Sequence, residues 1–475
     1  MVGTRPYLLG LGAVLVAPIC WAQPGALRQL PGDDGCWSDR DPPVECGVGR
    51  ALDGAFGLAT SLEGTNVYVA SDRSDAVAIF ARDPDDSRLT QLAGLEGCIS
   101  EDGSEGLCAL GRALLGASAI AISPDGNHVY LSASKSDAVA VFDRDPATGG
   151  LTQRLGLEGC ISEGGSGGTC VSGRALRGPL DVALSPDGAN VYVASSDSQA
   201  VAVLDKDPTT GDLSQRPDES GCVSLGGSIG TCSTGRALEG PWGLAISPDG
   251  LNLYVASDTG DAVAVFDREL TGGGLRQKEG PAGCISQSGH GGECEQGRAL
   301  RVPVRLGITA DGRQLVVAAW ESSAVAVLDR DPLTGALSQS PTEDGCVAEL
   351  GAREGCRDGR GLSGVFDVAE SSDGKNVYVA ASLGGALVVL DRTTSGAWMQ
   401  REGEGGCISQ DGQVNGCSSG RGLHWPTRVV VPVDDNSVYV VAQVSDAVAV
   451  FDREAWIFSD DFESGDSSAW TSTSP

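Results

Sequence analysis

The feature that most constrains this chain is the regular spacing of its cysteines. Fourteen of the fifteen cysteines form seven pairs, and nine residues separate the two members of each pair. The first members stand 62 residues apart, except for the last step, from Cys346 to Cys407, which is 61. A fixed period of this length indicates one supersecondary unit copied seven times. The pairs are Cys36/Cys46, Cys98/Cys108, Cys160/Cys170, Cys222/Cys232, Cys284/Cys294, Cys346/Cys356 and Cys407/Cys417.

The N-terminus has the layout of a secretory signal peptide. Arg5 precedes an apolar run over residues 7–19, and the small residue Ala22 follows shortly after. We therefore predict cleavage near Ala22 and a secreted or periplasmic protein. A lipid anchor on Cys20 is the alternative, but Ile19 is bulky where such signals need a small residue. The apolar run is too short to span a bilayer and no later segment is suitable, so no membrane span is expected.

Removal of residues 1–22 leaves an even count of fourteen cysteines, the number expected of a disulfide framework in an oxidising compartment. Zinc sites place cysteines two to four residues apart, whereas nine intervening residues rich in glycine make a flexible loop. We predict one disulfide within each pair, which stabilises each copy by roughly 2–3 kcal/mol on the chain-entropy model. Spacing alone leaves bridges between copies open as an alternative.

The charge balance limits the partners. Sixty-four acidic against thirty-three basic residues give a net charge of −31, and loss of Arg5 with the signal peptide removes one more positive charge. Such a chain is repelled by nucleic acid and by anionic lipid. The composition is typical of a solvated acidic surface on an exported protein.

The third copy shows the repeated unit most clearly. Leu180–Ser185 and Val191–Ser195 are apolar stretches on either side of a Pro-Asp-Gly turn, which predicts a hairpin. Ala200–Leu204 reads as a third strand rich in valine and alanine, and Asp212–Gln215 as a more polar fourth. Helical periodicity is absent.

Four antiparallel strands in each of seven copies predict an all-β, seven-bladed β-propeller over residues 23–455. The last copy offers only three strands, and Gly25–Leu30 matches the fourth-strand pattern seen at Gly149–Arg154. We therefore predict that this N-terminal strand completes blade seven and closes the ring, which removes an open sheet edge. Residues 456–475 leave the repeat as an acidic, serine-rich tail, either a disordered end or an attachment signal.

The words SPDGNHVYLSAS, SPDGANVYVASS and SPDGLNLYVASD recur at the fixed period, each followed by a strand like AVAVFDRD. They resemble the YVTN-type and lactonase-like seven-bladed propeller family, and the resemblance covers residues 24–453. It implies the propeller fold, together with a role either as a surface protein or as a sugar lactone hydrolase, because the family includes both. The cysteine loops depart from the plain family pattern.

Residues that occur in every copy are expected to serve the blade. The arginine of the GRAL-like words is one, and we expect it to bond loop carbonyls or a carboxylate. A single site on a ring needs residues that break the symmetry. One position just inside the first strand of each copy does so, with Gly57, Ala119 and Gly243 in three copies and charged residues in the others, which are Asp181, Arg305, Asp367 and Arg428. We predict that they converge on an axial pocket near the cysteine loops; a satisfied ion-pair network is the alternative.

Blade five deviates most from the repeat, with Trp320 and Glu321 in AAWESSAV. A tryptophan beside a carboxylate on a loop is a platform for a sugar or a similar ring. Trp242 and Trp425 are expected near the same channel mouth. In the alternative interpretation, these tryptophans fill gaps between blades.

The sequence contains few motifs that are typical of a catalytic site. The histidines His128, His290 and His424 are too scattered for one metal cluster, and no serine lies in G-x-S-x-G. No metal and no cofactor are therefore expected. If the protein is an enzyme, a carboxylate would act as general base and an arginine would stabilise the oxyanion, with His424 as a further candidate. The candidate bases are Asp181, Glu321 and Asp367, and the candidate arginines are Arg305 and Arg428.

The sequence predicts an exported, disulfide-stapled, monomeric propeller that binds a small molecule, a glycan or an extracytoplasmic protein at its channel mouth. The alternative is a lactone hydrolase resembling the 6-phosphogluconolactonase-like branch of the family. Against that alternative, the phosphorylated substrates of that branch are cytosolic, and an acidic chain attracts phosphate poorly. Electron transfer lacks ligands, because the chain has no C-x-x-C-H and only two methionines, Met1 and Met399.

Overall fold

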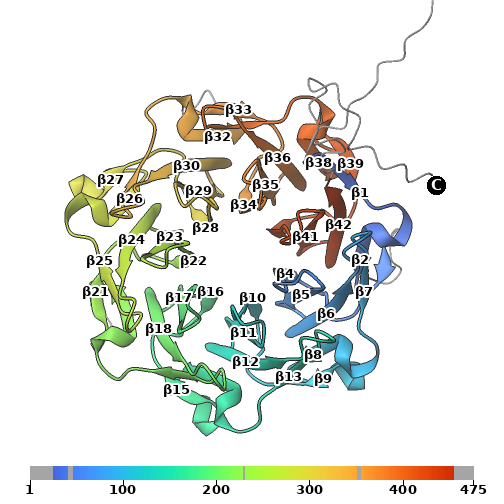
Figure 1. Cartoon of the computed structure of the whole chain (residues 1–475), viewed down its shortest axis with the longest axis vertical. Helices are drawn as coiled ribbons and strands as arrows, with labels where there is room; N and C mark the ends of the chain where they lie inside the picture. The colour runs from blue at the N-terminus through green and yellow to red at the C-terminus, as the bar shows by residue number, and fades with distance from the viewer. Residues whose placement is uncertain (1–24, 41–45, 228–229, 350–354, 454–475) are drawn as a thin grey trace, which may run out of the picture.

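The computed structural model describes residues 25–40, 46–227, 230–349 and 355–453. The predicted signal peptide and the acidic tail lie outside these residues. Seven β-sheets stand around a central axis like the blades of a propeller (Figure 1). The described residues form strands and short 3₁₀ turns, and none of these residues forms an α-helix. No helix in the described ranges is long and apolar enough to cross a membrane. The seven-bladed, all-β prediction is confirmed.

Three long strands form the inner part of each blade and pair antiparallel. The innermost strands line the axis and are β4 (Ala55–Thr60), β10 (Ala117–Ile122), β16 (Pro179–Leu184), β22 (Pro241–Ile246), β28 (Pro303–Ile308), β34 (Val365–Glu370) and β40 (Pro426–Val430). The second strands are β5 (Asn66–Ser71), β11 (His128–Ala133), β17 (Asn190–Ser195), β23 (Asn252–Ser257), β29 (Gln314–Ala319), β35 (Asn376–Ala381) and β41 (Ser437–Ala442). The third strands are β6 (Ala76–Arg82), β12 (Ala138–Arg144), β18 (Ala200–Lys206), β24 (Ala262–Arg268), β30 (Ala324–Arg330), β36 (Ala386–Arg392) and β42 (Ala447–Arg453). Their valines and alanines are almost all fully buried, because small β-branched residues fit sheets that are covered on both faces.

The predicted fourth strand is short and pairs with the end of the third strand. These strands are β1 (Leu27–Gln29), β7 (Leu89–Gln91), β13 (Leu151–Gln153), β19 (Leu213–Gln215), β25 (Leu275–Gln277), β31 (Leu337–Ser338) and β37 (Trp398–Gln400). In blade seven this place is taken by β1, with Leu27 opposite Arg453 and Gln29 opposite Phe451. The N-terminal strand therefore pairs with the last strand of the chain, as the repeat predicts.

The cysteine segments add two further strands to each blade, where the sequence suggested a flexible loop. The first cysteine begins a strand that pairs with the start of the third strand, and a second strand runs parallel to it at the blade edge. The cysteine strands are β2 (Cys36–Ser38), β8 (Cys98–Ser100), β14 (Cys160–Glu163), β20 (Cys222–Leu225), β26 (Cys284–Ser286), β32 (Cys346–Glu349) and β38 (Cys407–Gln410). The edge strands are β3 (Gly47–Val48), β9 (Ala109–Leu110), β15 (Val171–Gly173), β21 (Ser233–Gly235), β27 (Glu295–Gln296), β33 (Arg357–Gly359) and β39 (Ser418–Gly420). Each blade thus has six strands instead of four.

The disulfides join these two added strands within each blade. The bridges are Cys36–Cys46, Cys98–Cys108, Cys160–Cys170, Cys222–Cys232, Cys284–Cys294, Cys346–Cys356 and Cys407–Cys417. In every case the second cysteine directly precedes the edge strand, and the two Cα atoms lie 4.8–4.9 Å apart. The pairing within each repeat is confirmed, and the alternative of bridges between copies is wrong. The expectation of a flexible loop between the partners is also wrong, because the bridge ties two paired strands together.

The second cysteines are less deeply buried than the first. The first cysteines are at most 1% exposed, whereas Cys46, Cys108, Cys170 and Cys356 are 8%, 4%, 4% and 6% exposed. Cys417 is only half-buried. The second cysteines lie next to the edge strands, which are the strands farthest along each sheet from the axis, so the disulfides stabilise the rim.

Short 3₁₀ turns precede the cysteine strands. They are η1 (Gly32–Gly35), η2 (Gly94–Gly97), η4 (Leu157–Gly159), η6 (Glu219–Gly221), η7 (Gly280–Gly283), η9 (Glu343–Gly345) and η11 (Glu404–Gly406). Among the described residues, three more lie between the paired cysteines, namely η3 (Ser104–Gly106), η5 (Ser166–Gly168) and η8 (Gly289–Gly292).

The repeated GRAL arginine has the structural role expected of it. Arg50 Nη2 donates to the carbonyls of Leu92 and Gly94, at 3.2 and 2.9 Å. The backbone N–H of Arg50 donates to Gln91 Oε1, and Gln91 Nε2 donates back to the Arg50 carbonyl. This clamp joins the edge of one blade to the fourth strand of the next. At the ring closure, Gln29 and Arg421 make the same clamp.

A second repeated contact joins the blades on their buried faces. A tyrosine of the second strand donates its hydroxyl to a carbonyl of the next blade, as Tyr192 does to Gly273 at 2.8 Å. An arginine at the end of the next third strand donates to the same hydroxyl, as Arg268 does to Tyr192 at 2.7 Å. Two junctions depart from this pattern. Between blades two and three, Lys206 stands where the arginine would be, and between blades five and six, Val316 stands where the tyrosine would be.

Candidate functional site

The position predicted to break the symmetry lies beside a β-bulge. In each blade the pairing of the first two strands shifts register between the first and third residues of the innermost strand, as between Pro179 and Asp181. A bulge re-aims the side chains around it. The four charged residues at the third position come together on the axis, and we call them the axial quartet: Asp181, Arg305, Asp367 and Arg428.

Asp181 is the centre of the axial quartet. Its Oδ1 lies 2.6 Å from Arg305 Nη1 and 3.4 Å from Arg428 Nη2. Asp367 has a looser charged contact, since its Oδ2 lies 3.9 Å from Arg428 Nε. The quartet therefore links blades three, five, six and seven across the channel. Four predicted site residues are brought into one layer.

The two carboxylates also bind the backbone of the neighbouring blade. Asp181 Oδ2 accepts a hydrogen bond from the Leu244 N–H, and Asp367 Oδ2 accepts one from the Val429 N–H, each at 2.9 Å. Gly243 separates Asp181 from Arg305 in the ring, and a Cβ there would lie 2.5 Å from the Val304 carbonyl oxygen. Glycine at this position therefore lets the backbone of blade five pack closely against blade four, beside Arg305.

Burial and charge set the protonation behaviour of the quartet. The exposed side-chain fractions are 5% for Asp181, 2% for Arg305, 8% for Asp367 and 15% for Arg428. Burial would raise the pKa of Asp181, but the charges of Arg305 and Arg428 outweigh it and the pKa lies below its usual value. For Asp367 burial prevails over the same two arginines, and its pKa is raised. The two aspartates thus differ, with Asp181 the more firmly ionised.

The guanidinium group of Arg305 keeps a donor that the protein leaves unused. Its Nη2 reaches the Leu180 carbonyl at 3.4 Å, but its Nε is buried without a hydrogen-bond partner among the described residues. Burial and the charge of Arg428 lower the pKa of Arg305 in spite of Asp181 and Asp367. A donor of this kind can be satisfied by a ligand or by water. The Nε of the clamp arginines Arg112, Arg174, Arg236, Arg298 and Arg421 also has no partner among the described residues, so it is the place on the axis that makes Arg305 a candidate site residue.

An aromatic cluster lies one residue earlier on the innermost strands, and we call it the aromatic plug. Phe366 packs edge-on against Phe56 and Trp242, with ring centroids 5.7 and 6.0 Å away. These rings come from blades six, one and four, so they meet across the axis. Phe366 is only 7% exposed. The plug therefore covers the axial quartet on the side where the innermost strands begin, which is the side of the cysteine strands.

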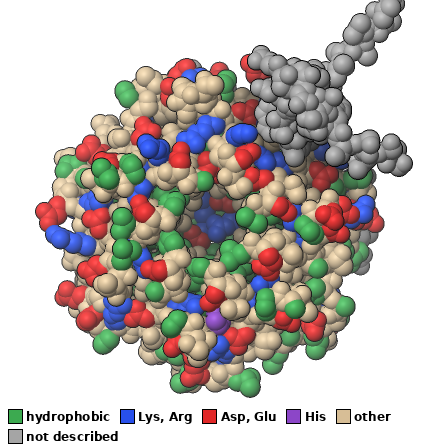
Figure 2. Space-filling model, viewed as in Figure 1, with side chains coloured by type: hydrophobic (Ala, Val, Ile, Leu, Met, Phe, Trp, Pro, Cys, Tyr) green, Lys and Arg blue, Asp and Glu red, His purple; other side chains and the backbone are tan. Residues whose placement is uncertain are grey.

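A hollow lies at the centre of the ring, and Figure 2 shows basic side chains at its bottom with hydrophobic side chains around it. The innermost strands carry two basic residues, Arg305 and Arg428. Because the aromatic plug covers the quartet from one side, we infer that the hollow reaches it from the other, where the hairpins of the first and second strands turn. The exposed part of Arg428 makes it the member that an incoming molecule meets first.

Trp320 and Glu321 do not join the axial quartet. The Trp320 indole Nε1 donates to Ser382 Oγ at 2.9 Å, and the ring packs against a core shared by blades five and six. Glu321 is exposed at the surface. Trp320 therefore fills a gap between two blades, as in the alternative interpretation of the sequence. Trp242 belongs to the aromatic plug.

His424 and Trp425 lie where the chain enters blade seven. Trp425 has a φ of +61°, a left-handed conformation that five other blades assign to glycine at the same place. His424 is exposed and lines a pocket of about 220 Å³ with Arg40, Asp411 and Ser445. This pocket lies between the cysteine strands of blades six and seven, away from the quartet.

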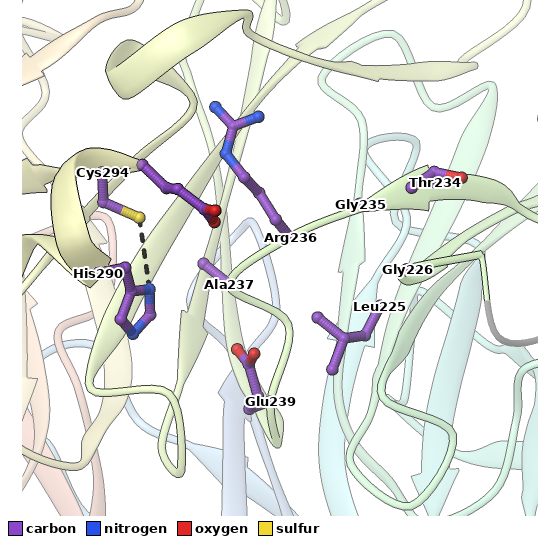
Figure 3. Close-up of a pocket in the computed structure, with 10 residues that line it drawn as sticks. Leu225, Gly226, Thr234, Gly235, Arg236, Ala237, Glu239, His290 and Cys294 are labelled. Atoms are coloured by element: carbon purple, nitrogen blue, oxygen red, sulfur yellow. Dashed lines mark hydrogen bonds between the residues drawn. The ribbon is translucent and has the colours of Figure 1, made fainter.

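The other histidines are also separate from the axis. His290 lies in a surface pocket of about 470 Å³ with Arg236 and Glu239 (Figure 3). Its Nδ1 is 3.5 Å from Cys294 Sγ, and that sulfur is held in a disulfide. His128 is buried beside Asp125 and Asp143 at the start of β11. Within the described residues, no group of three or more His, Cys, Asp or Glu is arranged to hold a metal ion.

Sequence reasoning missed Glu370, at the end of β34. The Ala310 N–H donates to Glu370 Oε2 at 2.6 Å, while Oε1 is buried with no hydrogen-bond partner in the described part of the chain. Burial raises the pKa of Glu370 to about 7. The repeat held a signal for it, because the equivalent position is threonine or aliphatic in the other six copies. Phe56 and Phe366 were missed for another reason, since nothing local shows that residues so far apart in sequence meet.

Comparison with known proteins agrees with this architecture. A family model described as a lactonase, 7-bladed β-propeller, matches residues 109–224. The chain resembles the lactonase-type propellers. The match begins at the edge strand of blade one and ends in the cysteine strand of blade three, so it includes Asp181 but not the other members of the quartet. No curated protein matches the chain significantly.

Solved structures share the fold at low sequence identity. The hydrazine synthase of Kuenenia stuttgartiensis is 17% identical with a TM-score of 0.51, over 85% of this chain and 97% of that one. A protein from Lactobacillus plantarum is 16% identical with a TM-score of 0.50, over 79% and 89%. A periplasmic gluconolactonase of Pseudomonas aeruginosa is 16% identical with a TM-score of 0.49, over 77% and 86%. Because 1222 chains match, these likenesses concern the common fold and do not distinguish functions.

Proposed function

We propose that this protein binds a small oxygen-rich acid, or the lactone of such an acid, at the axial quartet. The observation that carries the proposal is a pair of buried arginines on the propeller axis, beneath a central hollow that has basic side chains at its bottom (Figure 2). Guanidinium groups bind carboxylates and other oxyanions through several parallel hydrogen bonds. Arg428 offers the accessible edge, and Arg305 supports it from a deeper position.

The surroundings favour a small ligand. The aromatic plug excludes water from one side of the quartet, which strengthens charged contacts in the layer beneath it. At the level of the quartet, blades one, two and four carry only Gly57, Ala119 and Gly243. At this level, below the aromatic plug, these three blades present nothing larger than a methyl group to the axis. A ligand that enters the hollow therefore meets charge on one side and small residues on the other.

The compartment follows from the disulfides. Seven disulfides, one in each blade, indicate an oxidising and therefore extracytoplasmic environment. We propose that the segment 1–22 directs export, in agreement with this indication. A ligand of the mature protein would then come from outside the cytoplasm.

Binding is tested by titration calorimetry with a panel of sugar acids and their lactones. We expect saturable binding of at least one compound to the wild type and at least a tenfold loss in Arg428→Gln. Arg276→Gln is the matched control, because Arg276 is an arginine on the outer surface with a 74% exposed side chain. Equal binding by the wild type and the Arg428→Gln variant would refute the assignment of the site.

Lactone hydrolysis is the second candidate function. It is favoured by the family match and by the raised pKa of Asp367 beside Arg428. Asp367 would accept a proton from a water molecule as the water oxygen bonds to the lactone carbonyl carbon. Arg428 would stabilise the resulting oxyanion. The ring C–O bond then breaks, and Asp367 returns the proton to the leaving alkoxide, which yields the hydroxy acid.

Hydrolysis is separated from binding by following acid release from a lactone panel. If the protein is a hydrolase, Asp367→Asn should abolish turnover and still bind lactone, since the amide oxygen can accept the Val429 hydrogen bond. Arg428→Lys should retain a positive charge and lose most of kcat, because one ammonium group does not reproduce the guanidinium geometry. If the protein binds lactone tightly but releases no acid, hydrolysis is refuted and only the binding function remains.

A further inference from the structure

The charges in the quartet are not equally compensated. Asp181 contacts both arginines, the nearer at 2.6 Å. Asp367 is held by the backbone N–H groups of Val368 and Val429, and its one ion-pair contact within the described ranges is Arg428 at 3.9 Å. The second arginine acts on it only at longer range. Of the two carboxylates, Asp367 thus has the weaker support for its negative charge.

An anion at the bottom of the hollow competes with Asp367 for the same cation. Arg428 is the most exposed member of the quartet and turns its Nε toward Asp367. A carboxylate on Arg428 would place a second negative charge beside Asp367 in a water-poor layer. A buried carboxylate next to a like charge takes up a proton instead of staying ionised.

The charge count then limits which ligand fits. With Asp181 ionised and Asp367 protonated, the quartet carries one net positive charge, which a single negative charge neutralises. A ligand with two negative charges would leave one of them buried without compensation, at a large desolvation cost.

We propose that the axial site takes a singly charged carboxylate together with one proton held on Asp367, and that it discriminates against dianions such as phosphate esters. The inference rests on the proposed binding function and narrows its ligand class. It assigns Asp367 a role in specificity, and it separates this protein from propellers that act on phosphorylated sugars.

The coupling fixes the sign of the pH dependence. Ligand-bound protein holds more protons at Asp367 than free protein, so affinity is highest at low pH. Affinity falls as the pH rises above the pKa of Asp367 in the free protein, by up to tenfold per pH unit. It becomes constant again above the pKa that Asp367 has in the complex.

The experiment is titration calorimetry with D-gluconate and D-glucarate, which share a six-carbon skeleton and carry one and two carboxylates. Each titration is run in two cationic buffers with different enthalpies of ionisation, so that proton uptake is read directly. We expect uptake approaching one proton for each gluconate bound, and binding of glucarate that is at least tenfold weaker. Asp367→Asn mimics the protonated side chain, so it should bind gluconate without proton uptake and without the pH dependence.

Each outcome decides one statement. Gluconate binding to the wild type without proton uptake, or unchanged uptake in Asp367→Asn, would overturn the role of Asp367. Glucarate binding as tight as that of gluconate would overturn the charge selectivity. If no compound of the sugar acid panel binds to the wild type, the proposed function fails, and this inference fails with it. If Asp367→Asn does not fold, the buffer comparison on the wild type still measures the coupled proton.

Discussion

The junction between blades five and six offers a quantitative test of how the blades pack. Six second strands carry a buried tyrosine whose hydroxyl donates to the next blade, and blade five has Val316 at that place. In blade six, Trp398 replaces the leucine of the other fourth strands and is 1% exposed. Its Nε1 donates to Gln314 Oε1 of blade five at 3.0 Å, and Arg392 lies over its ring. At this junction the aromatic ring is thus supplied by blade six, whereas at the other junctions it is supplied by the preceding blade.

Exchange of the two residues should restore the ordinary junction. Trp398→Leu alone removes a buried ring and two polar contacts, at an expected cost of about 3–4 kcal/mol. Val316→Tyr alone adds a ring to a filled space, at about 1–3 kcal/mol. The double variant should lie within about 1 kcal/mol of the wild type, because it recreates the tyrosine and leucine pair of the other junctions. The coupling energy is then at least about 3 kcal/mol, which is at the upper end for contacting residues.

The measurement is a double-mutant cycle by chemical denaturation without reductant. Leu275→Trp is the matched control, because its junction, between blades three and four, already contains Tyr192, so this variant should be destabilised by about 1–3 kcal/mol. A coupling energy below about 0.5 kcal/mol would refute the reasoning, and so would a neutral Trp398→Leu variant.

Three further predictions concern stability and are read from the same denaturation curves. Joint replacement of Cys222 and Cys232 by serine should cost about 2.7 kcal/mol, because the open chain regains the entropy of a ten-residue loop; no loss would contradict the disulfide assignment. Asp181→Ala should cost about 3–5 kcal/mol, since it leaves two buried arginines without their shared partner, and a cost near zero would show that water replaces the carboxylate. Glu370 has a raised folded-state pKa of about 7, so its stabilisation is complete at acidic pH and is lost as pH rises from about 4.5 to 7; Glu370→Gln should remove this loss, on the order of 2 kcal/mol, and identical pH profiles would refute the shift.

The fold was predictable because the strand pattern and the cysteine spacing recur along the chain at one fixed period. The fixed period gives the number of blades, and the pattern of Gly25–Leu30 identifies the strand that closes the ring. The nine-residue spacing favoured a disulfide within each pair, and the structure was needed to exclude bridges between copies. The strand content of the cysteine segments was not predictable, because strands of two to four residues contain too few side chains to show a period.

The candidate site was predictable only in part. Comparison of the seven copies selects Asp181, Arg305, Asp367 and Arg428, because they break a repeated position. Their pairing was not predictable, since Arg305 reaches past blade four to Asp181 and this depends on the width of the ring. Trp320 breaks the repeat just as strongly, yet it fills space between blades. Departure from a repeat marks local change, and only geometry shows whether that change serves packing or a ligand.

The pairing of β1 with β42 has a consequence for biogenesis. Residues 27 and 453 are direct partners, so β1, which is synthesised first, cannot pair until β42, the last strand of the described residues, has been made. Blades one to six can assemble in order as they emerge, but blade seven needs both ends of the polypeptide. The ring therefore closes only when the C-terminal strand β42 is available. A chain truncated before β42 cannot complete blade seven.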